Sequence, residues 1–177
     1  MRPGRDAPRV PDPPPICTNS PTCTPSPTST AMTTSIHRIL CPVDFSPASA
    51  RALDVAIDYA RAFKAEVHAI HVYQLSAYAS PSSDLARDLE AQVRAELDKF
   101  IAGFTSHGVP IKTGLRMGVP YVEIVDAARD ASAELIVMGT TGKTGLQHLL
   151  LGSVAERVVR TAEVPVLSVR YQPPEGS

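Results

Sequence analysis

From Ile36 onward, short apolar runs alternate with longer segments whose apolar residues recur at helical spacing. Leu135 to Met138 is a continuous apolar run, which is typical of a strand buried on both faces. Leu53 and Ile57, four residues apart, instead belong to an amphipathic helix pattern. Five strand patterns alternating with four helix patterns predict an α/β fold. We expect a five-stranded parallel sheet, doubly wound and Rossmann-like, with helices on both faces.

End signals place the individual elements. Ser46 followed by Pro47 predicts a helix start, because serine caps helix N-termini and proline fits the first turn. Pro120 gives a similar start for the third helix, and Gly108 is the expected end of a second helix over 85–104. The expected strands are residues 39–43, 67–72, 109–115, 135–138 and 165–169, and the fourth helix covers residues 154–162.

Residues 1–35 differ in composition from the remainder. They hold nine of the seventeen prolines and eleven Ser/Thr residues, with no aromatic residue. Such a segment buries too little apolar surface to offset the entropy of ordering, so we expect disorder, as for the tail at 172–177. A secretory or transit peptide is disfavoured, and translation from Met32 would leave residues 1–31 out of the native protein. The expected domain therefore covers residues 36–171.

Composition disfavours several classes of function. A net charge of −1 provides no general attraction for nucleic acid or anionic membrane. No apolar stretch approaches the roughly 18 residues of a spanning helix. The three cysteines (Cys17, Cys23 and Cys41) contain no C-x-x-C pair, which argues against a zinc site or a disulfide framework and favours a cytoplasmic protein. Cys41, inside an apolar run, is expected to be inert.

His68 and His71 lie on one expected strand, where we expect them to share a face. A metal pair at this position would need further ligands, and no Cys, Asp or Glu joins them at ligand spacing. We therefore interpret both histidines as structural, and we expect no metal site in the protein itself.

A glycine-rich segment follows the apolar run that ends at Met138. Gly139, Gly142 and Gly145 precede a helix that begins near Ser153. Glycines let main-chain N–H groups approach an anion, and a helix N-terminus adds unpaired N–H groups and a favourable dipole. In doubly wound sheets, ligands bind outside the carboxyl ends of the strands, where the strand order reverses. The segment therefore predicts a phosphate-binding loop, with a plain connector as the alternative.

Two common nucleotide motifs do not fit this segment. Gly142-Lys143-Thr144 resembles the end of a Walker A loop, but the required first glycine would fall at Val137, inside the strand. Gly139 and Gly142 are three residues apart, which excludes G-x-G-x-x-G.

The spacing G-x2-G-x9-G-[ST], found at Gly139, Gly142, Gly152 and Ser153, resembles the ATP-binding signature of one branch of the universal stress protein family. Residues 39–46 (ILCPVDFS) are similar to the family's first strand and P-x-D-x-S turn. The resemblance covers about residues 36–171. It implies an adenine nucleotide alpha hydrolase-like fold, binding of ATP with Mg²⁺, and a regulatory role in the response to stress.

The resemblance also implies roles for individual residues. Asp44 would bind the nucleoside, although a simple turn role is the alternative. Apolar residues would flank the adenine, and Gly139 would let the ribose approach the backbone. Thr141 replaces the His or Arg that related proteins often carry, and Lys143 is a candidate to supply that charge. The full expected ATP-binding set is Pro42, Val43, Asp44, Val72, Met138, Gly139, Gly142, Lys143, Gly152, Ser153 and Val154.

Pro165 to Val169, as the last strand, is expected at a sheet edge, which must be covered or paired. The resemblance implies pairing with a second copy, so we expect a homodimer whose protein partners are unidentified. We expect no enzyme, although slow ATP hydrolysis is compatible with the pattern. A stress protein that acts only through protein partners is the first alternative. A nucleotidyl transferase is less favoured, because Asp44 to Ala48 holds neither a HIGH-type nor an S-G-G-x-D-S motif.

Overall fold

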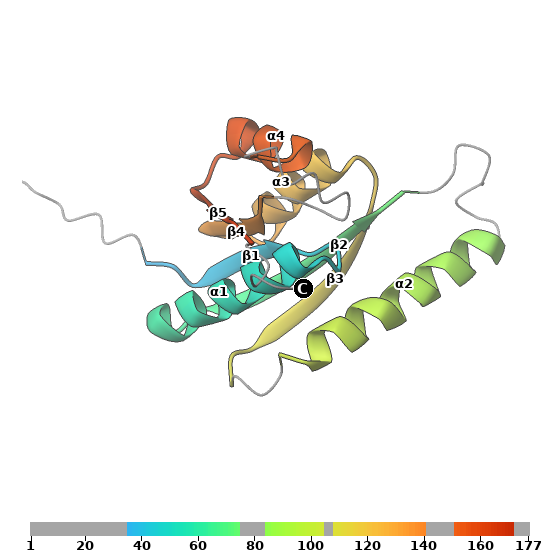
Figure 1. Cartoon of the computed structure of the whole chain (residues 1–177), viewed down its shortest axis with the longest axis horizontal. Coiled ribbons are helices and arrows are strands. Elements are labelled where there is room, and N and C mark those ends of the chain that lie inside the picture. Colours follow the sequence, from blue (N-terminus) through green and yellow to red (C-terminus); the bar gives the residue numbers. More distant parts are fainter. Residues whose placement is uncertain (1–34, 75–83, 105–107, 141–150, 172–177) are drawn as a thin grey trace, which may run out of the picture. The chain divides into compact units, whose positions relative to one another are not determined.

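The computed structural model describes residues 35–74, 84–104, 108–140 and 151–171. They form a five-stranded parallel sheet in the order β3-β2-β1-β4-β5 (Figure 1). The predicted α/β fold is confirmed. The elements are β1 (Arg38–Pro42), α1 (Pro47–Phe63), β2 (Glu66–Tyr73), α2 (Asp84–Ala102), β3 (Ile111–Met117), α3 (Pro120–Asp130), β4 (Leu135–Gly139), α4 (Ser153–Thr161) and β5 (Val166–Val169). The predictions for residues 1–34 and for the 172–177 tail lie outside the described residues.

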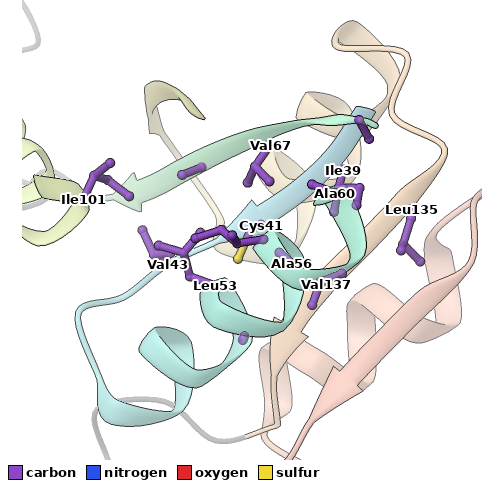
Figure 2. Close-up of a cluster of buried hydrophobic side chains, with 14 of the residues drawn as sticks. Ile39, Cys41, Val43, Leu53, Ala56, Ala60, Val67, Ile101, Leu135 and Val137 are labelled. Carbon is purple, nitrogen blue, oxygen red and sulfur yellow. The ribbon is translucent and has the colours of Figure 1, made fainter. Parts of the chain in front are cut away.

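The two faces of the sheet are covered by different helices. Helices α1 and α2 lie on one side, and α3 and α4 lie on the other (Figure 1). Successive strand residues point to opposite faces, so Ile39 and Cys41 join one core cluster and Leu40 joins the other. Figure 2 shows the first cluster, in which Leu53 of α1 and Ile101 of α2 join Ile39 and Cys41 of β1. This double cover explains why residues 135–138 are all buried, as predicted.

The predicted start of α1 is confirmed in detail. Ser46 is the N-cap residue, and its hydroxyl accepts a hydrogen bond from the main-chain N–H of Ser49 at 3.2 Å. Pro47 occupies the first turn, where its missing N–H has no cost. At the other end Lys64 adopts φ 57° and donates its N–H to the carbonyl of Ala60. These local signals fix the two ends of α1, which begins shortly after β1.

The largest differences from the sequence-based boundaries are at the end of α2 and at both ends of β3. Helix α2 ends at Ala102, so Gly108, with φ 70°, lies outside the helix and does not cap it. Strand β3 begins at Ile111 and not at Val109, because Pro110 has no N–H for the ladder. Pairing with β2 carries β3 on to Met117, opposite Tyr73.

The expectation that His68 and His71 share a face is wrong. The two residues are three positions apart on β2, and side chains an odd number apart point to opposite faces. His71 stacks on Phe45, whereas His68 contacts Glu66 at 2.7 Å on the other side of the sheet. Within the described ranges, no three His, Cys, Asp or Glu side chains gather closely enough to hold a metal ion.

Cys41 is fully buried in β1. Burial raises the pKa of its thiol well above the usual range, because the thiolate would lose its hydration. The prediction of an unreactive Cys41 is therefore supported. In the part of the chain that the structure describes, no helix is both long enough and apolar enough to cross a lipid bilayer.

Candidate functional site

A cavity of about 360 Å³ lies at the carboxyl ends of the central strands. It opens where β1 and β4 adjoin, and this is the point at which the strand order reverses. Its walls come from the ends of β1, β2 and β4 and from the first turns of three helices. The described residues that line it are Pro42, Val43, Asp44, Ser49, Val72, Pro120, Ile124, Met138, Gly139, Thr140, Gly152, Ser153, Val154 and Ala155.

Nine of the eleven residues predicted from sequence line this cavity. The other two, Gly142 and Lys143, lie outside the described residues, as does Thr141. Sequence reasoning missed Ser49, Pro120, Ile124, Thr140 and Ala155. Pro120 was predicted only as the start of a helix.

Asp44 stands immediately after β1, in a closed hydrogen-bond network. Its Oδ1 accepts bonds from the main-chain N–H of Ser46 at 3.1 Å and from the Ser46 hydroxyl at 2.5 Å. The main-chain N–H of Asp44 donates to the hydroxyl of Ser49 at 3.3 Å, and that hydroxyl donates to the carbonyl of Ser46 at 3.0 Å. Asp44 therefore does stabilise the turn, and the same residue also lines the cavity.

Gly139 ends β4 against the first turn of α1. A Cβ atom built on Gly139 would lie 3.1 Å from both the carbonyl carbon and the carbonyl oxygen of Ala48. The structure thus gives Gly139 a packing role besides its expected closeness to a ligand. The small residue lets β4 and α1 approach at the floor of the cavity.

The N-terminus of α4 faces the cavity through Ser153, Val154 and Ala155. The N-cap is Gly152, which has no side chain to bond the first turn, so the main-chain N–H groups of that turn receive no cap from it. The N–H of Gly152 itself donates to the carbonyl of Thr140 at 2.6 Å. The resemblance assigned Gly152 to the ligand, but this N–H instead joins the residue before α4 to the residue after β4. The N–H groups of residues 153–155 are the remaining donors for an anion.

Several of the residues that line the cavity are apolar. Val43, Val72 and Met138 come from three strand ends, and Pro120 and Ile124 come from α3. Among the described lining residues, Asp44 is the sole charged one. The cavity therefore combines an apolar slot, one carboxylate and a helix N-terminus, which together suit a ligand with a flat base, hydroxyl groups and an anionic end.

Comparison with known proteins assigns the chain to a protein family. The model of the universal stress protein family matches residues 35–170, which is most of the chain. The chain belongs to the universal stress protein family. A universal stress protein of Methanocaldococcus jannaschii is 44% identical over 138 residues, covering 75% of this chain and 81% of that protein.

Solved structures of universal stress proteins share the fold. The protein from Lactobacillus plantarum matches with a TM-score of 0.67 and 30% identity, over 76% of this chain and 98% of that one. A universal stress protein in complex with cAMP matches with a TM-score of 0.62 and 26% identity, over 76% of this chain and 97% of that one. Members of the family are generally regulatory proteins.

Proposed function

We propose that this universal stress protein binds ATP in the cavity between β1 and β4 and acts as a nucleotide-responsive regulator. The observation that carries the proposal is the meeting of Asp44 and the N-terminus of α4 at one apolar cavity. A volume of about 360 Å³ falls within the range of small-molecule sites.

Each part of the cavity suits one part of the nucleotide. Val43, Val72 and Met138 offer apolar surface to the adenine. The Asp44 carboxylate can accept hydrogen bonds from hydroxyl groups of the ribose. The main-chain N–H groups at the start of α4 suit the phosphates, because the helix dipole and the unpaired donors both favour negative charge. Mg²⁺, when bound with ATP, would offset phosphate charge and would be held chiefly by phosphate oxygens.

The related structure in complex with cAMP supports an adenine nucleotide as the ligand class. ATP is preferred over a shorter nucleotide because the spacing of Gly139, Gly142, Gly152 and Ser153 resembles the ATP-binding signature of the family. A regulatory role is preferred over catalysis because phosphoryl transfer requires several groups that stabilise transferring charge. Asp44 is the one charged group among the described lining residues. A cytoplasmic location stays a prediction from the cysteine pattern.

Thermal unfolding of the full chain with and without Mg·ATP tests the proposal. ATP at a hundred times its Kd adds about 2.7 kcal/mol, which raises the midpoint by several degrees for a chain of this size. The variant Asp44→Asn is the matched control, because its amide oxygen still accepts from Ser46 but carries no charge. We expect a smaller shift in Asp44→Asn. Absence of a shift in the parent would favour the alternative of a stress protein that acts only through partner proteins.

We also propose a homodimer formed through β5. Strand β5 pairs with β4 on one side and is the terminal strand in the sheet order. In a parallel strand, the main-chain N–H and C=O groups of alternate residues point toward the same neighbouring strand. The carbonyls of Pro165 and Val169 accept hydrogen bonds from the main-chain N–H groups of Ile136 and Thr140. The main-chain groups of Ser168 therefore point away from β4, toward the edge that a second copy would occupy.

A further inference from the structure

Phe45, between Asp44 and Ser46, has an unusual backbone. Its φ is 63°, in the left-handed region that glycine adopts easily and a bulky residue rarely adopts. This conformation turns the chain so that the Asp44 carboxylate can accept from Ser46 two residues on. Such strain persists only when surrounding structure holds the residue in place. The turn that carries Asp44 therefore needs support from elsewhere in the fold.

Two aromatic side chains from other elements hold Phe45. The ring of Phe45 stacks on the imidazole of His71, with centroids 4.3 Å apart and planes inclined by 23°. On the α2 side, Phe100 meets Phe45 edge to face at 5.6 Å and 66°. His71 belongs to β2 and Phe100 to α2. The rings thus link the turn after β1 to two elements that are far from it in sequence.

His71 also holds the chain on the other side of Asp44. Its Nδ1 lies 2.7 Å from the carbonyl oxygen of Val43. A carbonyl oxygen can only accept, so Nδ1 carries the proton and donates. Because His71 is only 9% exposed, little water competes for this bond. One side chain therefore contacts the residue before Asp44 through a hydrogen bond and the residue after it through a ring stack.

We propose that His71 is a positioning residue for the nucleotide site, and that it acts by fixing the Asp44 carboxylate. The inference rests on the proposed function. His71 is not among the described residues that line the cavity, so its effect on a ligand must pass through the turn. A purely structural histidine would instead affect folding without any special coupling to Asp44.

Two substitutions separate the two contacts of His71. His71→Phe keeps an aromatic ring for the stack but removes the donor to Val43. His71→Asn keeps a donor near the position of Nδ1 but removes the ring. Each change is made in the full chain, alone and together with Asp44→Ala. The dissociation constant for Mg·ATP is measured by calorimetry in all variants, and this completes a double-mutant cycle.

We expect His71→Phe to weaken ATP binding about tenfold when Asp44 is present, the effect of one hydrogen bond. In the Asp44→Ala background, the same substitution should change the constant less than about twofold, because the group that it positions is gone. Equal losses in both backgrounds would overturn the inference while leaving ATP binding established. Failure of the parent to bind ATP would overturn the proposed function and this inference with it.

A ligand-free measurement supplies a second test. The main-chain N–H of Ser46 donates to Asp44 Oδ1, so its hydrogen exchange reports whether the turn is closed. We expect His71→Phe to speed exchange at Ser46 about tenfold or more, and His71→Asn to speed it less, because the donor is retained. Exchange at Ile136, which bonds to Pro165 in the sheet, should be unchanged. Equal acceleration at both amides, or none at Ser46, would contradict a positioning role.

Discussion

Gly139 at the end of β4 passes so close to Ala48 in α1 that a Cβ on Gly139 would lie 3.1 Å from the Ala48 carbonyl oxygen. Neither backbone can yield easily, because β4 is paired on both sides and α1 is capped just before Ala48. The contact sets the distance between the strand and the helix that together frame the cavity.

Gly139→Ala should therefore destabilise the protein by about 1–3 kcal/mol, the usual cost of overpacking a well-packed site. Chemical denaturation with urea measures this loss. Gly114→Ala is the matched control on another strand, because its Cβ would meet only the Ile70 side chain at an ordinary 3.5 Å. A loss for Gly139→Ala no larger than that for Gly114→Ala would contradict the close contact.

Ser46 links the stability of α1 to the turn that carries Asp44. Its hydroxyl accepts from the N–H of Ser49 and donates to Asp44 Oδ1. Ser46→Ala should lower the free energy of unfolding by about 0.5–2 kcal/mol, the range measured for loss of a helix cap. Ser46→Asn retains a capping acceptor and should remain close to the parent. Equal stabilities for Ser46→Ala and the parent in urea denaturation would show that the cap contributes nothing.

Glu66 makes the stability of the protein depend on pH in the acid range. A hydrogen bond from Lys112, and to a smaller extent one from His68, lowers the pKa of the Glu66 carboxyl to about 2. The value in an unfolded chain is about 4.3. The lower pKa in the folded state means that the pairing stabilises the fold above about pH 4.3 and is lost as the pH falls toward 2. The group is partly exposed, so the contribution should stay below about 1 kcal/mol.

Glu66→Gln should consequently destabilise the protein more at pH 7 than at pH 3, because part of the Glu66 contribution is already lost at pH 3. Urea midpoints of parent and variant at the two pH values measure the difference, and 1 M salt should reduce it at pH 7. The same difference at both pH values would mean that the Glu66 charge is not the cause.

The β5 homodimer can be tested without changing the core. Ser168→Pro removes an N–H that points away from β4, and proline at a sheet edge blocks pairing with another strand. We expect the parent and Ser168→Ala to sediment as dimers at micromolar concentration and Ser168→Pro to sediment as a monomer with an unchanged circular dichroism spectrum. A monomeric parent would contradict the proposed dimer, and a dimeric Ser168→Pro would place the interface elsewhere.

Sequence patterns predicted the sheet, the buried run at 135–138 and the start of α1, because each depends on residues close together in the chain. The end of β3 was missed because it depends on pairing with β2, more than forty residues away, and its start was placed too early although Pro110 is visible in the sequence. The end of α2 was placed too late because Phe104 continues the apolar stripe, although it packs on the core from the turn after the helix.

Within the cavity, Gly139, Gly152 and Asp44 were predicted because their motifs resemble those of the universal stress protein family. The contributions of Pro120 and Ile124 were not, because they depend on how α3 crosses the sheet. The ring contacts of Phe45 with His71 and Phe100 join three parts of the chain that are far apart in sequence, so no local pattern predicts them. The wrong expectation that His68 and His71 share a face also kept the contact between His71 and Phe45 from being predicted. Counting strand parity correctly would have placed His71 on the α1 side.

Calorimetric titration of the full chain with Mg·ATP tests the central claim most directly. We predict one ATP bound per chain, with affinity that falls about tenfold or more in Asp44→Asn, because that variant keeps the turn but loses the charge that faces the nucleoside. Absence of binding heat in the parent at several temperatures, or identical affinity in Asp44→Asn, would contradict a nucleotide site built around Asp44 between β1 and β4.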